Sequence, residues 1–121
     1  MLDLPAEPKP VPLARTDDVW EGAILQGTLP DGHKLALYHY DGHFYATDDT
    51  CTHGAASLSE DGSVEGPFVE CGWHNGQYDL RTGEACTMPC TEPLKSWPIQ
   101  VVDGQVCVLW PPAPRRVAGR A

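Results

Sequence analysis

Basic residues are scarce in this chain, and none occurs in its middle. The formal net charge is -9, and residues 35–80 hold no Lys or Arg but eight acids: Asp41, Asp48, Asp49, Glu60, Asp61, Glu65, Glu70 and Asp79. Nucleic acids and anionic membranes are bound through Lys and Arg, so we expect neither as a partner. The acidic stretch instead favours transient electrostatic docking to a protein that carries a basic patch.

Long apolar runs are also missing. No segment approaches the ~20 apolar residues that span a bilayer. The N-terminal stretch "MLDLPAEPKPVP" lacks the basic and apolar regions of a secretory signal. The five cysteines are an odd number, which does not suggest a disulfide framework. We therefore expect a cytoplasmic protein.

Helical periodicity is weak throughout the chain, whereas turn signals are frequent. No window repeats apolar residues every 3.6 positions, so we expect one helical turn in "RTDDVWEG", with Thr16 as its N-cap. Short apolar runs are separated by pairs typical of type I′ hairpin turns: Asp31-Gly32, Asp41-Gly42, Asp61-Gly62 and Asp103-Gly104. "HKLALYHY" with "HFYAT", and "SWPIQVV" with "QVCVLW", read as two hairpins.

This pattern predicts an all-β protein with a small antiparallel barrel or sandwich as its base. We expect one domain over residues 11–110, with residues 48–92 inserted into the base as a separate subdomain. Residues 1–10 and 111–121 are rich in proline and are predicted to be flexible tails.

Two mixed pairs of cysteine and histidine stand in the predicted insertion: Cys51-x-His53 and Cys71-x-x-His74. A structural zinc site takes the same residue types, but zinc fingers usually pair Cys with Cys and His with His. Mixed pairs suit two metals that share the ligands, because each pair can give one ligand to each iron of a [2Fe–2S] cluster. Both cysteines would then hold one iron and both histidines the other, as in a Rieske centre. A zinc-stabilised interaction module remains the alternative.

The stretches "CTHGAASLSEDG" and "CGWHNGQYDLRTGEA" resemble the two cluster-binding boxes of Rieske proteins. From about residue 11 to 110 the chain is similar to the Rieske-type ferredoxins of multicomponent aromatic-ring-hydroxylating dioxygenases, and "MPCTEPL" is similar to their third loop near the cluster. The resemblance implies a Rieske fold and one [2Fe–2S] cluster, with His53 and His74 as the exit for the electron. It also implies that Trp73 and Pro89 shield the cluster from water.

The residues around the motif bear on the redox potential. Two imidazoles and two thiolates leave the oxidised cluster with zero net charge, which makes it easier to reduce than a cluster with four thiolates. High-potential Rieske proteins carry a disulfide and a serine where this chain has Ala56, Trp73 and Gly76. Tyr78 matches a position whose hydroxyl bonds a ligand sulfur in those relatives. With acids nearby, we expect a potential of about -150 to 0 mV, the low end of the Rieske range.

Two catalytic features are missing from the sequence. We find neither a second domain with a 2-His-1-carboxylate iron site nor a G-x-G-x-x-G nucleotide motif. The resemblance therefore implies a soluble electron carrier, with no catalytic site of its own, in aromatic hydrocarbon catabolism. Its partners would be an NAD(P)H-dependent flavoprotein reductase and a terminal Rieske non-haem iron oxygenase. A small Rieske subunit bound stably to a larger oxidoreductase is the alternative.

The remaining candidates for chemistry have plainer interpretations. Cys107 alternates with valines and is predicted to be a core residue, and Cys86 and Cys90 are predicted to be plain thiols near the third loop. We interpret as hairpin residues His33, His39 and His43, and as packing residues Trp20, Trp97 and Trp110.

Overall fold

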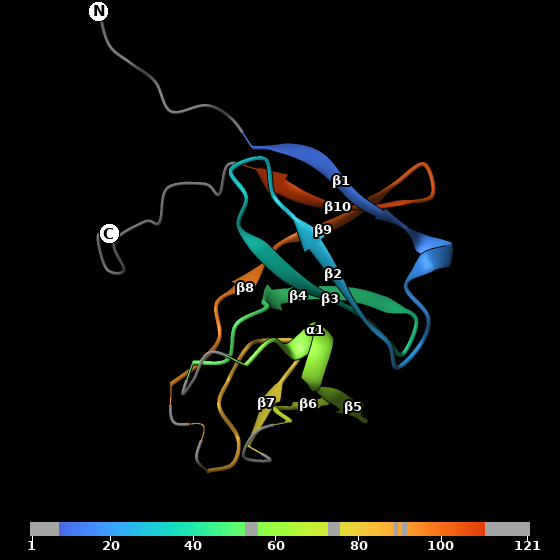
Figure 1. Ribbon diagram of the computed structural model, residues 1–121. Coiled ribbons are helices and arrows are strands. Elements are labelled where there is room, and N and C mark those ends of the chain that lie inside the picture. The colour runs from blue at the N-terminus through green and yellow to red at the C-terminus, as the bar shows by residue number, and fades with distance from the viewer. Residues whose placement is uncertain (1–7, 53–55, 73–75, 89, 91, 111–121) are drawn as a thin grey trace, which may run out of the picture.

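The computed structural model describes residues 8–52, 56–72, 76–88, 90 and 92–110, and it confirms an all-β fold built from antiparallel sheets (Figure 1). The first sheet has the order β1 (Lys9–Arg15), β10 (Gln105–Trp110), β9 (Ile99–Val102). The second has the order β2 (Ile24–Thr28), β3 (Lys34–Tyr40), β4 (His43–Asp48), β8 (Ser96–Trp97). The third has the order β5 (Ser63–Glu65), β6 (Phe68–Glu70), β7 (Gln77–Asp79). The helical elements are η1 (Thr16–Asp18) and α1 (Leu58–Asp61).

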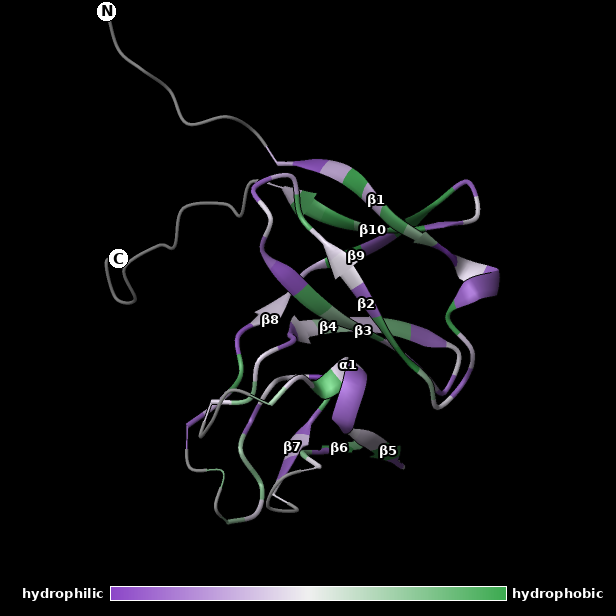
Figure 2. Ribbon diagram, in the orientation of Figure 1, coloured by the Kyte–Doolittle hydropathy of each residue, from purple (hydrophilic) through white to green (hydrophobic). Residues whose placement is uncertain are grey.

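The first two sheets form the base, and the third sheet lies with α1 at one end of it (Figure 1). The chain enters this end after β4 and returns to the base at β8, as the predicted insertion requires. Helix α1 is hydrophobic where it begins and hydrophilic beyond, so its first residue, Leu58, is fully buried (Figure 2). Within the described residues, no helix is long and apolar enough to cross a membrane.

Strand β3 separates two apolar cores. Its side chains alternate between the two faces of the sheet. Leu35 and Leu37 face the core of the base, whereas Ala36 and Tyr38 face a second core beneath the third sheet. All four side chains have 0% exposure. The second core also contains Cys51, Cys71 and Cys90, so the base directly supports the segment with the predicted metal ligands.

Two of the four Asp-Gly pairs form the predicted hairpin turns. Asp41 and Gly42 have φ of 53° and 78° between β3 and β4, and Asp103 and Gly104 have 51° and 77° between β9 and β10. Both residues of a type I′ turn need positive φ, so these predictions are confirmed. The pair at 31–32 lies in a longer loop.

The turn prediction at 61–62 is wrong. Asp61 ends helix α1, and Gly62 follows with φ of -90° and donates its N–H to the carbonyl of Leu58. A Cβ on Gly62 would lie 2.6 Å from that carbonyl oxygen. This glycine is therefore needed for close packing at a helix end and not for a left-handed turn.

Three other local predictions need correction. Thr16 is the first residue of η1 and not its N-cap, because its hydroxyl donates to the carbonyl of Gly104 across the domain at 3.3 Å. "SWPIQVV" is not one strand, because Pro98 has no N–H and separates β8, which pairs with β4, from β9, which pairs with β10. Strand β1 begins at Lys9, two residues before the predicted start of the domain. Residues 1–7 and 111–121, predicted as tails, lie outside the described residues.

Candidate metal centre

Two loops of equal length place a cysteine at the same position. The first loop (residues 51–56) follows the bridge between Thr50 and Ser57, and the second loop (residues 71–76) follows the paired residues 70 and 77 of β6 and β7. The Cys51 N–H donates to the carbonyl of Ala56 at 2.9 Å, and the Cys71 N–H donates to that of Gly76 at 2.8 Å. Each loop is thus closed by one backbone hydrogen bond from its cysteine to the residue five positions on.

Both cysteine side chains are buried, with 2% exposure for Cys51 and 0% for Cys71. The Tyr78 hydroxyl lies 3.1 Å from the Cys51 Sγ and 2.7 Å from the Thr52 Oγ1. It also accepts the Thr52 N–H at 3.1 Å. Burial, followed by the contact with Cys51, raises the pKa of Tyr78, so its hydroxyl keeps its proton and can donate it to a thiolate.

A third thiol lies beside these two cysteines. Cys90 has 4% exposure, and burial raises the pKa of its thiol. A hydrogen bond with Tyr78 lowers this pKa, whereas the negative charges of Cys51 and Cys71 raise it further. All three cysteines pack in the same core. Cys86, four residues earlier, is exposed. The two thiols that the sequence grouped together therefore have different surroundings.

The third loop (residues 86–92) is fixed to both of the other loops. The Cys86 N–H donates to the Gln77 carbonyl, and the Gln77 N–H donates to the Thr87 Oγ1, each at 2.8 Å. The Thr52 hydroxyl donates to the Glu92 carbonyl at 2.9 Å. Because Gln77 follows the second loop and Thr52 belongs to the first, these bonds join all three loops.

Two glycines let the backbone approach closely around the loops. A Cβ on Gly72 would lie 2.0 Å from the carbonyl oxygen of Asp61 at the end of α1. Gly83 has φ of +86°, and its Cβ would lie 2.1 Å from the carbonyl oxygen of Leu94. The Leu94 N–H donates to the Gly83 carbonyl at 2.7 Å. Side chains at these positions would displace the second loop or the segment that follows the third.

Asp49 joins the first loop to its support. Its side chain accepts hydrogen bonds from the Ser57 hydroxyl at 2.6 Å, the Ser59 N–H at 2.8 Å and the Gln26 amide at 3.1 Å. Burial would raise the pKa of Asp49, but these hydrogen bonds outweigh it and lower the pKa. Asp49 has 3% exposure, so it does not belong to the acidic surface with which the sequence grouped it. It ties β2, the first loop and α1 together.

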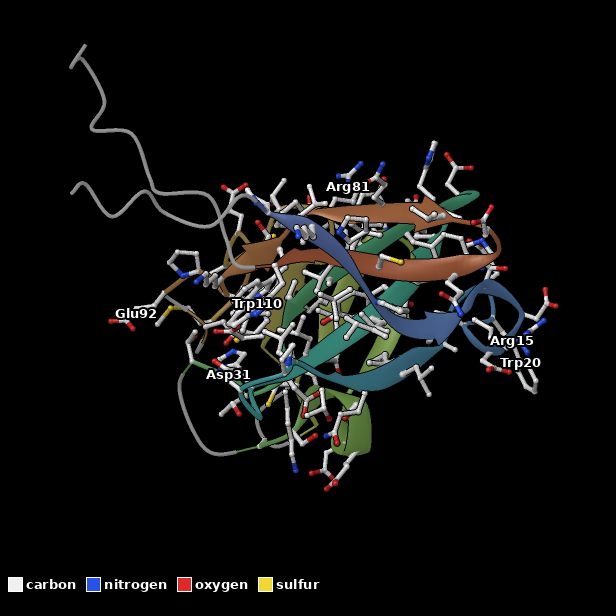
Figure 3. The ribbon with its side chains drawn as sticks, turned by 90° about the horizontal axis from the view of Figure 1, so that it is seen from above. Arg15, Trp20, Asp31, Arg81, Glu92 and Trp110 are labelled. Atoms are coloured by element: carbon white, nitrogen blue, oxygen red, sulfur yellow. The ribbon has the colours of Figure 1, made fainter. Side chains whose placement is uncertain are left out.

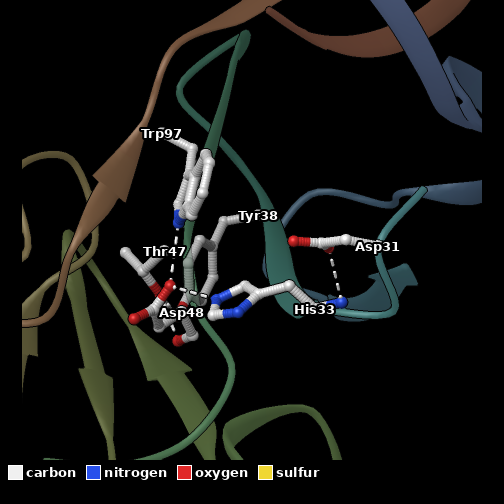
Figure 4. Close-up of polar contacts among 6 residues, drawn as sticks. All are labelled: Asp31, His33, Tyr38, Thr47, Asp48 and Trp97. Atoms are coloured by element: carbon white, nitrogen blue, oxygen red, sulfur yellow. Dashed lines mark hydrogen bonds and ion pairs between the residues drawn. The ribbon is translucent and has the colours of Figure 1, made fainter. Parts of the chain in front are cut away.

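The preceding residue, Asp48, ties three elements of the base (Figure 4). One of its carboxylate oxygens lies 2.8 Å from the His33 Nε2 and accepts the Trp97 indole N–H, also at 2.8 Å. His39 lies between the carbonyl of Val19 and the carboxylate of Glu21. These two histidines thus make structural contacts, as predicted.

The predicted ligand set is only partly described by the structure. His53 and His74 lie outside the described residues, as do Trp73 and Pro89. Within the described part of the chain, no three Cys, His, Asp or Glu side chains converge on a metal position. The donor set that is visible fits an iron–sulfur cluster, because two buried sulfurs share a core with a hydroxyl that can donate to one of them.

Comparison with known proteins adds to this geometry. Residues 9–98 match the model of the Rieske [2Fe-2S] domain. The chain belongs to the Rieske [2Fe–2S] domain family. Over 98 residues it is 60% identical to the ferredoxin component of the p-cumate 2,3-dioxygenase system of Pseudomonas putida, covering 81% of this chain and 83% of the relative. The resemblance to dioxygenase ferredoxins is therefore confirmed.

Solved structures of Rieske ferredoxins share the fold. The Sphingomonas yanoikuyae B1 ferredoxin superimposes with a TM-score of 0.81 at 35% identity, over 85% of this chain and 100% of that one. A ferredoxin chain from the complex of reduced oxygenase and oxidised ferredoxin in carbazole 1,9a-dioxygenase gives 0.77 at 38% identity, over 83% and 92%. These Rieske relatives are named as electron-transfer components and not as catalytic subunits.

Several side chains of this Rieske site could not be assigned from the sequence. Thr52 and Asp49 act through partners that lie 26 and 23 residues away along the chain, Tyr78 and Gln26. No motif spacing marks such contacts. Trp20 was predicted to pack, yet it is 73% exposed, because its indole N–H is bonded to the nearby Asp17 carbonyl and its ring faces outward. Cys107 is buried in β10, as predicted.

Proposed function

We propose that this protein carries single electrons from an NAD(P)H-dependent flavoprotein reductase to a terminal Rieske non-haem iron oxygenase. The observation that carries the proposal is the matched pair of loops that bury Cys51 and Cys71 in one core, in a chain of the Rieske family. These cysteines, with His53 and His74, would hold one [2Fe–2S] cluster, which supplies one-electron redox chemistry when bound.

The residues of the chain would give this cluster a defined environment. The base and the third sheet exclude water from the two sulfurs, and the Tyr78 hydroxyl donates to the Cys51 sulfur when that sulfur is a thiolate. A hydrogen bond to a ligand sulfur stabilises the more negative, reduced state. The backbone bonds at Cys51 and Cys71 hold both cysteines in equivalent positions in their loops.

The partners are proposed from the relatives. The 60% identity to a p-cumate dioxygenase ferredoxin makes an oxygenase for p-cumate, or for a similar aromatic acid, the first to test. Docking would be transient and electrostatic, because the chain has a formal net charge of -9. We place the system in the cytoplasm, where reduced nicotinamide cofactors are supplied.

The decisive experiment combines metal analysis with EPR of the purified protein before and after dithionite. We expect iron without zinc, a silent oxidised sample and, after reduction, a rhombic signal whose average g is clearly below that of all-cysteine ferredoxins. Replacing Cys51 or Cys71 with serine should abolish that signal, whereas Cys107→Ser should leave it unchanged. Zinc in place of iron would instead indicate a structural site and refute the proposal.

Electron transfer itself is tested by mixing reductase, this protein and oxygenase, with NADH consumption and product formation as readouts. Product should form only when all three components are present. Gel filtration of the mixture at low and at 0.5 M salt distinguishes a carrier from a permanent subunit. A carrier dissociates in salt, whereas a complex that survives would favour the stably bound subunit.

A further inference from the structure

We propose that Met88, with Glu84 and Glu92, forms the surface by which this protein recognises its terminal oxygenase. Met88 would enter an apolar recess of the partner, and the two glutamates would meet basic residues at its rim. The inference rests on the proposed function, since it assigns the docking surface of that electron carrier.

The exposure of Met88 has no explanation within the domain. Among the described residues, the exposed large hydrophobic side chains are Met88 at 75%, Trp20 at 73% and Val101 at 49%. The Trp20 indole is bonded to a neighbouring carbonyl, and Val101 lies on strand β9 of the base. Met88 alone of the three lies in a loop that contacts the candidate metal site. Methionine is enriched at the centre of protein interfaces because it adapts to the shape of the partner.

The backbone around Met88 is held in place. The Cys90 N–H donates to the Thr87 carbonyl at 3.0 Å and closes the turn that contains Met88. Thr87 is bonded in turn to Gln77 at both its N–H and its hydroxyl. Backbone hydrogen bonds thus fix the turn before binding, so the ordering cost on binding falls mainly on the Met88 side chain, which favours rapid and reversible association.

The turn also brings Met88 close to the redox site. Cys90, at the base of the turn, is buried in the same core as Cys51 and Cys71. A partner seated over Met88 would thus approach the cluster from the side of the third loop. Electron transfer requires such proximity, so the position suits a contact that is made and broken with each electron.

Exposed acids flank Met88 in the chain. Glu84 and Glu92 are exposed on either side of it in the chain, and Glu92 extends from the end of the molecule opposite Trp20 (Figure 3). The nearest described bases in the sequence have internal partners. Arg81 pairs with Asp79 at 2.8 Å, and the Lys95 ammonium lies 4.1 Å from the Trp97 ring centroid. An exposed apolar side chain flanked in the chain by exposed acids fits a partner whose recess is bordered by Lys or Arg.

The test uses the cluster-loaded full chain and the terminal oxygenase of the P. putida p-cumate system. Steady-state turnover is measured against the concentration of this protein, with reductase in excess. We expect Met88→Gln to raise the KM for this protein about tenfold with kcat unchanged, because one central apolar contact contributes about that much to affinity. Met88→Leu should restore most of the affinity. Val101→Gln, an equal change of polarity on the base, is the matched control.

The glutamates are tested by salt. Glu84→Gln/Glu92→Gln should raise the KM at low ionic strength and flatten its dependence on salt, whereas Met88→Gln should leave that dependence unchanged. EPR spectra and reduction by dithionite should match the unchanged protein in every variant, which excludes damage to the cluster.

The outcomes separate the two proposals. If the unchanged protein passes no electrons to the oxygenase, the proposed function fails, and the docking inference fails with it. If the unchanged protein transfers electrons and Met88→Gln has the same KM, the carrier function stands and the docking inference is refuted. An equal loss in Val101→Gln would also refute it, because the effect would then not be local to the third loop.

Discussion

Removing the Tyr78 hydroxyl is the sharpest test of how this structure sets a redox potential. The hydroxyl has one proton and three acceptors in reach: the Cys51 Sγ at 3.1 Å, the Thr52 Oγ1 at 2.7 Å and the Cys90 sulfur. The Thr52 hydroxyl uses its own proton on the Glu92 carbonyl, so it can only accept from Tyr78. A metal-bound thiolate has no proton either, so Tyr78 must be the donor to Cys51. Tyr78→Phe deletes this donor and preserves the ring.

The size of the effect follows from the charge of the acceptor. A hydrogen bond to a charged group contributes about 1.5–3 kcal/mol, and the reduced cluster is the more negative state. We take about 1 kcal/mol as the difference between the two oxidation states. For a one-electron couple 59 mV corresponds to a factor of ten, or about 1.4 kcal/mol, so the potential should fall by about 40 mV. The redox potential of the unchanged protein is expected at about -150 to 0 mV.

The assay is protein-film voltammetry of the loaded protein, with Tyr38→Phe as the matched control. Tyr38 is as fully buried as Tyr78, and its hydroxyl bonds the Thr47 Oγ1 at 2.8 Å. Both variants should lose about 1 kcal/mol of stability, but only Tyr78→Phe should shift the potential. An unchanged potential in Tyr78→Phe, or an equal shift in Tyr38→Phe, would refute the reasoning.

Thr52→Val should move the potential in the opposite direction. The substitution removes the competing acceptor and keeps the Thr52 backbone N–H, which still donates to the Tyr78 oxygen. The Tyr78 proton would then go only to sulfur, at Cys51 or Cys90. A rise in potential is expected in the same voltammetric measurement, by less than the fall in Tyr78→Phe. A fall would show that the proton is not shared between the two acceptors.

Three further predictions concern stability and reactivity. Because hydrogen bonds lower the folded-state pKa of Asp49, its stabilisation is present above the unfolded value of about 3.9 and is lost as pH falls through the folded value. The free energy of unfolding of Asp49→Asn, measured by urea titration, should therefore be about 1–3 kcal/mol lower at pH 7 than that of the unchanged protein. It should also depend less on pH in the acid range. Gly83→Ala should destabilise by about 2 kcal/mol more than Gly32→Ala, since both have positive φ but only Gly83 meets a backbone oxygen. Cys86 is exposed, but partial desolvation and then the nearby carboxylates raise the pKa of its thiol. Its alkylation, followed by mass spectrometry, should therefore be slow at pH 7 and become faster as the pH rises.

Local chemistry made the hairpins predictable. Asp-Gly at 41–42 and 103–104 folds as expected because a type I′ turn depends on its own two residues and on the flanking strands. The same dipeptide at 61–62 ends a helix instead. Ser57 caps that helix by accepting the N–H of Glu60, and Asp49 fixes its start from outside. Contacts from a distant segment thus overrode the local preference.

The candidate site likewise has features that the sequence predicts and features that it does not. The two mixed Cys/His pairs predict a shared metal centre, and the structure shows the same backbone bond at the cysteine of each pair. The burial of Asp49 could not be predicted, because a lone acid in an acidic stretch reads as surface. The division between Cys86 and Cys90 depends on how the third loop folds back onto β7, which no local pattern specifies.

The contacts that hold the three loops have a common property that bears on electron transfer. The N–H groups of Cys51 and Cys71 make backbone hydrogen bonds, Asp49 accepts from protein donors, and the fit at Gly83 is a contact between backbones. None of these contacts uses a cysteine sulfur, unlike the contact between Tyr78 and Cys51. Strand β3 extends this support into the base, because Leu37 packs in one core while Tyr38 packs in the other. An electron carrier works fastest when its surroundings need not rearrange, and these contacts hold the loops through groups other than the cysteine sulfurs.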